Sequence, residues 1–303
     1  MNKNFSNTER AIKALLETED SFVYRSRTYK TKVVGKPSPA SGECKTDIYV
    51  LAETADYAAK EFKISIKQSN ADFIGNKLSL DRAIEIFGEE APAIIVEHTN
   101  SIREYFEAST LVFFDKKNRT DAKSMTLGWK FEIMNKTSGN KSGKLNLTHQ
   151  QKIEIYSGQN LQEGKRNSRV NGLPVEDSGV ANFMLVVDST IDQDLDYYMN
   201  QLVPVEEYVD DKELYFACKA LNYRIAPNKW DGNRPLCVYV NWQLYNGELS
   251  ATLVYTNPLE TKGNEPGNNL REILQELDIT ENNFSQIEQY LSENVSTYKE
   301  GRK

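Results

Sequence analysis

The chain has 303 residues, a hydrophobic fraction of 39% and a formal net charge of −7, which is enough sequence for one large domain or two ordinary ones. Three cysteines without a CxxC pair and only two histidines argue against a disulfide framework, a zinc finger and a multi-histidine metal site. A bound metal would therefore be held by oxygen atoms, which favours magnesium, manganese or calcium, and no apolar run is long enough to span a membrane.

The amino-terminal part of the chain predicts a helix followed by strand-forming sequence. The first residues contain no continuous apolar stretch, which predicts a cytoplasmic protein. A protein encoded by a bacterium or a phage is expected. Residues 6–9 match a capping box, and the apolar residues after them recur at helical spacing, so a helix is expected over 6–19. A β-prone run over 22–34 ends in a loop rich in Gly, Pro and Ser.

A β-hairpin is expected next, with strands over 45–51 and 61–67. The connection between these strands is short, which predicts antiparallel neighbours. Apolar and polar residues alternate in the second strand, so Ser65 and Lys67 are expected on a polar face that points away from the core. With matching registers, Asp47 and Lys67 would lie at the same edge of the sheet.

The remaining sequence predicts further helices and strands. The Asn246-Gly247 dipeptide, between two alternating runs, indicates the clearest hairpin turn of the chain. Helices are expected over 78–88, 102–111, 269–277 and 281–291, strands over 126–133, 180–187, 236–245 and 248–255, and a partly helical segment over 191–208.

The middle of the chain is basic although the whole chain is acidic. Residues 115–169 hold 12 Lys and Arg against 5 Asp and Glu, a balance of +7, so the rest of the chain carries −14. This segment is either a solvated, loop-rich surface or a surface that faces phosphates. Lys165, Arg166 and Arg169 are the candidate DNA-binding residues within it.

Residues 43–68 carry the clearest chemical signal. Hydrolysis of a phosphodiester requires groups that neutralise the phosphate and activate a water, and carboxylate-held divalent ions with a nearby lysine suffice. The segment with Asp47, followed by Ile64-Ser65-Ile66-Lys67-Gln68, resembles the core of restriction-endonuclease-like nucleases, the PD-(D/E)xK superfamily. The resemblance implies a mixed β-sheet flanked by helices, with Asp47 as a metal ligand and Lys67 as the residue that orients the attacking water. It also implies Mg²⁺ or Mn²⁺ as the cofactor and Gln68 as a positioning residue.

The sequence departs from the superfamily pattern at Ser65, where a second acid is usual. Some restriction enzymes of the superfamily carry the same Ser-x-Lys and take the missing carboxylate from the following helix. At that spacing lie Asp81 and, one turn later, Glu85. Glu43 and Glu9 are the other candidates.

The sequence thus predicts an α/β protein with a restriction-endonuclease-like nuclease core over 1–135. Residues 136–303 would form an additional C-terminal α+β region, with the basic loops, a hairpin and helices, that packs on the same core and completes a DNA-binding surface or a homodimer contact. The predicted activity is that of a magnesium-dependent endonuclease acting on DNA. The alternatives are a non-catalytic module that binds nucleic acid or protein on a degenerate nuclease fold, and a structural protein of a phage or cell assembly.

Overall fold

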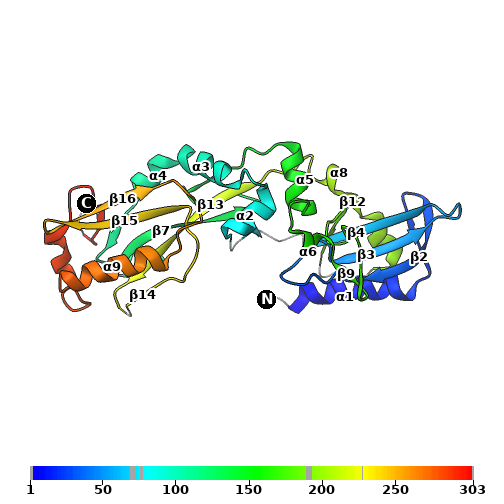
Figure 1. The fold of residues 1–303 in the computed structure, drawn as a ribbon, viewed down its shortest axis with the longest axis horizontal. Coiled ribbons are helices and arrows are strands. Elements are labelled where there is room, and N and C mark those ends of the chain that lie inside the picture. Colours follow the sequence, from blue (N-terminus) through cyan, green and yellow to red (C-terminus); the bar gives the residue numbers. More distant parts are fainter. Residues whose placement is uncertain (1–2, 69–72, 76–77, 189–192, 227, 302–303) are drawn as a thin grey trace. The chain divides into compact units, whose positions relative to one another are not determined.

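The computed structural model shows a mixed α/β protein with two curled mixed β-sheets, each flanked by helices (Figure 1). It describes residues 3–68, 73–75, 78–188, 193–226 and 228–301. The contacts divide the chain into two discontinuous units. The first unit comprises Met1–Ala71, Ile84–Gly88 and Asn146–Lys212, and the second comprises Asp72–Ala83, Glu89–Leu145 and Glu213–Lys303.

These units do not follow the expected division into 1–135 and 136–303. The physical reason lies in the first sheet, where β4 (Ala59–Gln68) pairs in parallel with β11 (Phe183–Val187). Parallel neighbours require a long crossover connection. Here the connection from β4 to β11 includes two segments of the second unit, Asp72–Ala83 and Glu89–Leu145. A division of the chain at one point therefore cannot separate the two units.

The first unit contains one six-stranded sheet, a two-stranded ribbon, the 16-residue helix α1 and shorter helices. In chain order its elements are α1 (Lys3–Thr18), β1 (Ser21–Tyr24), β2 (Arg27–Gly35), β3 (Ile48–Glu53), β4, α5 (His149–Ser157), α6 (Glu163–Arg166), β9 (Arg169–Val170), β10 (Leu173–Pro174), β11, α7 (Leu195–Asn200), β12 (Val203–Pro204) and α8 (Val205–Tyr208). Helix α2 (Leu80–Phe87) is shared between the units.

The strand order of the first sheet is β1-β2-β3-β4-β11-β12. Strands β1 to β4 form an antiparallel meander, so the predicted antiparallel pairing of the 45–51 and 61–67 strands is confirmed, with Ile48 opposite Ile64. Alternate residues of β3 and β4, among them Phe62 and Ile66, are buried with the apolar residues of α1 and α7. This burial fixes the register, because a slip by one residue would turn the apolar set away from the helices.

Gly179 fixes the segment that leads into β3. Its carbonyl oxygen accepts hydrogen bonds from the N–H groups of Lys45 at 3.0 Å and Thr46 at 3.3 Å, and its own N–H donates to the oxygen of Arg166 at 2.8 Å. A Cβ atom at position 179 would lie 2.0 Å from the carbonyl oxygen of Lys165, a distance that no side chain allows. Only glycine permits this close approach of three backbone segments.

The second unit is built on the long strand β7 (Ser124–Met134), which pairs with β13 (Tyr215–Arg224) over most of its length. The turn at Asn246 and Gly247 has positive φ values of 51° and 77°, as predicted for a two-residue hairpin. The other elements are β5 (Phe73–Gly75), α3 (Ala91–Ser101), α4 (Arg103–Glu107), β6 (Val112–Phe113), β8 (Ser142–Lys144), β14 (Lys229–Trp230), β15 (Val238–Tyr245), β16 (Glu248–Val254), α9 (Asn264–Glu276), the 3₁₀ helix η1 (Phe284–Tyr290) and β17 (Thr297–Tyr298).

Several elements differ from the sequence-based expectation. The β-prone run over 22–34 is a hairpin, because Arg25 and Ser26 adopt positive φ values of 46° and 61° and reverse the chain. The helix expected over 102–111 ends at Glu107, and α3 precedes it. The helix expected over 281–291 is the shorter 3₁₀ helix η1. Part of the 191–208 segment lies outside the described residues, and the rest contains the expected short helices.

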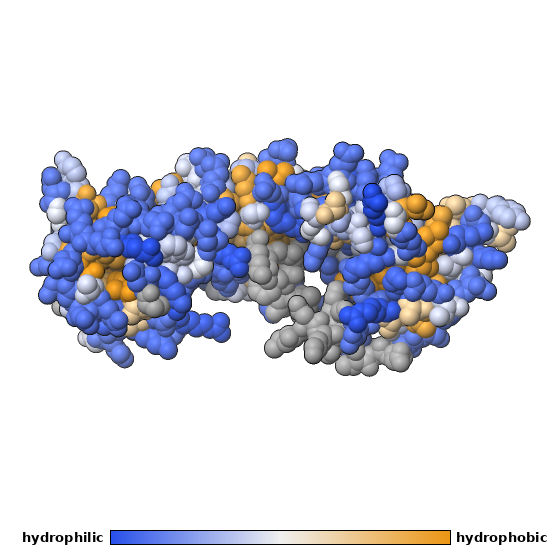
Figure 2. Space-filling model, turned by 60° about the horizontal axis from the view of Figure 1, so that its bottom comes forward, coloured by the Kyte–Doolittle hydropathy of each residue, from blue (hydrophilic) through white to orange (hydrophobic). Residues whose placement is uncertain are grey.

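The face of the molecule in Figure 2 is mostly hydrophilic, and hydrophobic residues appear on it only in limited areas. None of the helices in the described part of the chain combines the length and apolar character needed to cross a bilayer.

We expect Gly179→Ala to destabilise the first unit by about 1–3 kcal/mol, because the added methyl group overlaps the backbone of Lys165. Urea unfolding followed by circular dichroism measures this change. Gly164→Ala is the matched control, since nothing lies within 4 Å of a Cβ at that position. An unchanged stability of Gly179→Ala would contradict the close packing described above.

Candidate functional site

Asp47 lies immediately before β3 and is fixed by two hydrogen bonds to β4. Its N–H donates to the oxygen of Ile64 at 2.8 Å, and its carboxylate Oδ2 accepts from the N–H of Ile66 at 2.7 Å. The carboxylate thus continues the pairing of the two strands beyond the first residue of β3. Continuing the register of Ile48 and Ile64 by one residue places Asp47 opposite Ser65.

The Asp47 carboxylate is coupled to charged groups from three other segments. Burial raises the pKa of Asp47 above its ordinary value, and the Lys67 ammonium and the Ile66 hydrogen bond oppose this rise. The Glu9 carboxylate raises the pKa further, whereas the Lys36 ammonium lowers it. The charges of Lys67, Glu9 and Lys36 therefore all act on the Asp47 carboxylate.

A cavity of about 510 Å³ opens in front of Asp47. It lies entirely within the first unit, between α1, the loop that follows β2 and the segment that leads into β3. The residues with polar or ionisable side chains that matter for its chemistry are Glu9, Lys36, Glu43, Cys44, Thr46 and Asp47.

Glu9, on α1, is only 8% exposed, and its carboxylate accepts a hydrogen bond from the Nζ of Lys36 at 2.5 Å. Burial tends to lower the pKa of Lys36, but the hydrogen bond and charge of Glu9 outweigh burial, so the pKa of Lys36 lies above its ordinary value. Lys36 therefore stays protonated beside two carboxylates. No motif in the sequence indicates this role for Lys36, since it depends on the loop after β2 folding back onto α1.

The carboxylates of the following helix are placed elsewhere. Glu85 is 5% exposed, and its carboxylate forms an ion pair with the Nζ of Lys165. Asp81 lies in the first turn of α2, in the part of that helix that belongs to the second unit. Neither residue lines the cavity in front of Asp47, whereas Glu43 lines it and is exposed to solvent.

The polar face expected on β4 is largely covered. Ser65 is completely buried, and Lys67 and Gln68 are half-buried at the end of the strand. Ser65 lies in an interior strand, between β3 and Met184 of β11. Within the described part of the chain, its hydroxyl and that of the buried Thr46 have no hydrogen-bond partner. Two unpaired hydroxyl groups therefore lie next to the Asp47 segment.

The candidate DNA-binding residues have different surroundings. Lys165 is paired with Glu85, and Arg166 donates two hydrogen bonds to Asp177 at 3.0 and 2.8 Å. Arg169 is exposed, and its guanidinium lies 3.5 Å from the oxygen of Gly172. The basic segment 115–169 is itself divided, because its first part belongs to the second unit. Arg169 is thus the residue of the three with its side chain most open to a ligand.

The carboxylate oxygens near Asp47 are suitable ligands for a hard cation, but there are few of them. Across the residues that the structure describes, no group of three or more His, Cys, Asp or Glu side chains could hold a metal ion. Asp47 and Glu9 nevertheless line one cavity, and magnesium is commonly bound by one or two carboxylates while water molecules fill the other positions. The oxygen donors present therefore fit a single, partly hydrated Mg²⁺.

Comparison of this chain with protein-family models, with curated proteins and with solved structures finds no match. The candidate site is therefore defined by its residues and geometry alone.

Because burial raises the pKa of Asp47, its ionisation opposes folding. Below the ordinary pKa of an aspartate this unfavourable contribution is absent, and it develops as the pH rises through the raised pKa of the folded state. We therefore expect Asp47→Asn to raise the unfolding temperature at pH 7 and to lose this advantage in acid. Thermal unfolding followed by circular dichroism at several pH values measures the difference.

The matched control is Asp56→Asn, in the turn between β3 and β4. The hydrogen bond from the Thr54 hydroxyl lowers the pKa of Asp56, so its ionised form favours folding and its replacement should not stabilise the protein. An Asp47→Asn variant that is less stable than the wild type at pH 7 would show that the charge at position 47 supports the fold.

Proposed function

We propose that the first unit is a metal-dependent nuclease of the restriction-endonuclease-like type and that it hydrolyses phosphodiester bonds within DNA. The observation that carries the proposal is the Asp47 carboxylate, which is fixed at the entry to β3, shares a cavity with Glu9 and has the rise of its pKa opposed by the charge of Lys67 on β4. The mixed sheet flanked by helices agrees with what the resemblance implies.

Each residue of the site would have a distinct role. Asp47 and Glu9 would hold Mg²⁺ or Mn²⁺, which on binding supplies charge neutralisation at the phosphate and a more acidic water. The Lys67 ammonium would orient the attacking water and donate a hydrogen bond to the phosphate. Lys36 would hold Glu9 in place and reduce the repulsion between the two carboxylates.

This assignment gives a physical meaning to Ser65. A carboxylate at position 65 would be fully buried and opposite Asp47, so two negative charges would be adjacent in the sheet. A serine avoids this repulsion, and Glu9 would supply the second carboxylate from α1. Gln68, half-buried at the end of β4, would contribute to positioning beside Lys67.

Replacement of Asp47 or Lys67 by Ala should reduce magnesium-dependent cleavage of plasmid DNA by about a hundredfold or more, because each removes a group that acts at the reacting phosphate. Gel electrophoresis of the products, with magnesium or with EDTA, measures the loss. Lys63→Ala is the matched control, since Lys63 is also half-buried on β4 but its ammonium forms an ion pair with Glu61 at 3.6 Å. Full activity of both site variants would rule out the proposed nuclease site.

The second carboxylate can be identified by comparing four variants. We expect Glu9→Gln to raise the magnesium concentration required for half-maximal cleavage by about tenfold or more. Glu43→Gln and Asp81→Asn should have smaller effects, because one side chain is solvated and the other lies in the second unit. Glu85→Gln should instead lower the stability, because it leaves Lys165 without its charged partner. A dominant effect of Asp81→Asn would assign the second carboxylate to α2.

The alternative is a non-catalytic module that binds nucleic acid on a degenerate nuclease fold. It is favoured by one observation, the lack of a three-residue metal-ligand group in the part of the chain that the structure describes. Retention of DNA in a gel-shift assay without cleavage in magnesium or manganese would support this alternative.

A further inference from the structure

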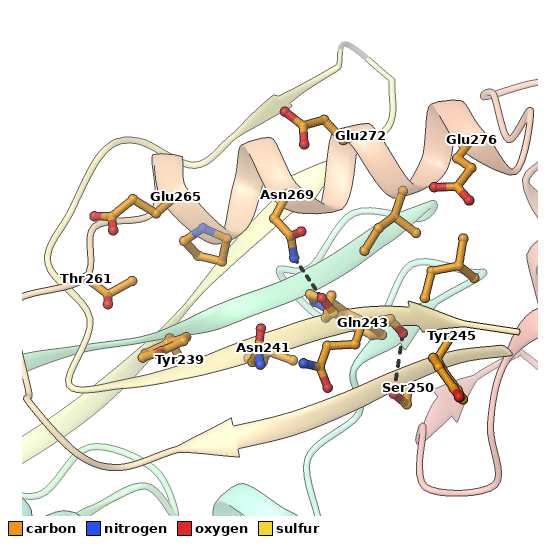
Figure 3. Close-up of a pocket in the computed structure, with 15 residues that line it drawn as sticks. Tyr239, Asn241, Gln243, Tyr245, Ser250, Thr261, Glu265, Asn269, Glu272 and Glu276 are labelled. Atoms are coloured by element: carbon orange, nitrogen blue, oxygen red, sulfur yellow. Dashed lines mark hydrogen bonds between the residues drawn. The ribbon is translucent and has the colours of Figure 1, made fainter. Parts of the chain in front are cut away.

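The second unit contains a groove between helix α9 and strand β15, with a volume of about 700 Å³ (Figure 3). We call it the α9–β15 groove. The residues that matter for its chemistry are three glutamates of α9 and three amide side chains from both elements. They are Glu265, Glu272, Glu276, Asn269, Asn241 and Gln243.

The groove follows an open edge of β15. On one side β15 pairs with β16 along nearly its whole length, from Tyr239 to Tyr245. On the other side it pairs with β7 only through Val238 and Tyr239, and in the described part of the chain no strand continues this pairing. At Trp242 the backbone oxygen accepts a hydrogen bond from the side chain of Asn269 at 2.7 Å. Helix α9 therefore occupies this edge at Trp242, and the rest of the edge, which has no strand partner in the described part of the chain, can bind an extended peptide through its backbone.

The charged side chains that line the groove are all glutamates. No Lys, Arg or His is among the lining residues. The nearby Arg271 on α9 is directed elsewhere, because its guanidinium donates to Asn228 at 3.1 Å and lies over the ring of Trp230 at 4.8 Å. In the residues described, no ion pair involves Glu272 or Glu276, and both are exposed. The groove is therefore an acidic surface without an internal counter-charge.

Two amide side chains are available in the groove. Asn241 and Gln243 lie on the same face of β15, two residues apart, and Figure 3 shows both beside the groove. Among the described residues neither side chain has a hydrogen-bond partner. Each carries a donor and an acceptor, which is what a peptide backbone requires of a binding surface.

The dimensions suit an extended chain. The lining includes β15 from Tyr239 to Tyr245, about 20 Å at the rise of a strand, and α9 from Glu265 to Glu276, about 16 Å at the rise of a helix. A volume of about 700 Å³ spread over this length is narrow. Glu272 and Glu276 are four positions apart, which corresponds to about 6 Å along α9, close to the spacing of alternate residues in an extended peptide.

We propose that the α9–β15 groove binds an extended segment of a partner protein that carries Lys or Arg at alternate positions. Two successive basic side chains pair with Glu272 and Glu276, and the peptide backbone contacts the amides of Asn241 and Gln243. The site lies in the unit that does not contain Asp47, so it does not depend on the proposed nuclease activity.

The test uses the full chain and a fluorescein-labelled acetylated hexapeptide of alternating lysine and serine, with fluorescence anisotropy as the readout. We expect saturable binding that weakens with salt, and the combined Glu272→Gln and Glu276→Gln variant should weaken it about fivefold or more. The matched control is the pair Glu104→Gln and Glu293→Gln, which removes the same charge from exposed positions of the same unit outside the groove. This control should change the affinity by less than about twofold.

The proposal is overturned if the wild type does not bind the peptide, if both glutamate pairs have equal effects, or if a peptide with Glu in place of Lys binds as well. Displacement of the peptide by an equal concentration of spermidine would show a site for small organic cations and would also overturn it. Where the glutamate variant fails to fold, Asn241→Ala combined with Gln243→Ala replaces it. Unchanged affinity of that folded variant likewise contradicts the proposed backbone contacts.

Discussion

The hydrogen bond between the Asp47 carboxylate and the N–H of Ile66 is the interaction on which the candidate site depends. It places a charged group where two strands of the sheet separate, in surroundings that disfavour the charge. Some of the surrounding groups compensate for this burial, whereas the Glu9 carboxylate disfavours the charge of Asp47 further. Lys67 and Lys36 supply positive charge, and Gly179 holds the segment that leads into β3. Functional sites commonly contain a charged group that is buried although burial disfavours its charged form.

Much of the first unit's local structure could be predicted from the sequence, because its signals are local. The alternation in β4 and the helical spacing of the apolar residues in α1 depend only on neighbouring residues, and both elements form close to where they are expected. The predicted capping box is wrong, because α1 begins at Lys3 and residues 6–9 lie inside the helix. The parallel pairing of β4 with β11 could not be predicted in the same way. It joins segments far apart in the chain, and the apolar run at 183–187 gives no information about its neighbour.

The site shows the same contrast. Asp47 and Lys67 could be selected from the sequence because the strand period relates them, and in the structure the charge of Lys67 acts on the Asp47 carboxylate. Glu9 was an open candidate, and its nearness to Asp47 depends on how α1 crosses the end of the sheet. Lys36 has no sequence signal, since a lysine in a loop rich in Gly and Pro is usually solvated. Asp81 and Glu85 have the expected spacing along the chain. The spacing does not predict that the two ends of this helix belong to different units, with Asp81 in the second and Glu85 in the first.

The parallel pairing of β4 and β11 also bears on how the protein is made. Asp47 and Lys67 leave the ribosome early, whereas β11 is synthesised only after the chain has passed through the first half of the second unit. Until then β4 has an unpaired edge, and the face around Ser65 remains uncovered on that side. The nascent chain therefore holds these ionisable residues in an incomplete sheet until β11 has been synthesised. Such an order makes the first unit sensitive to the speed of elongation and to chaperones that shield exposed strands.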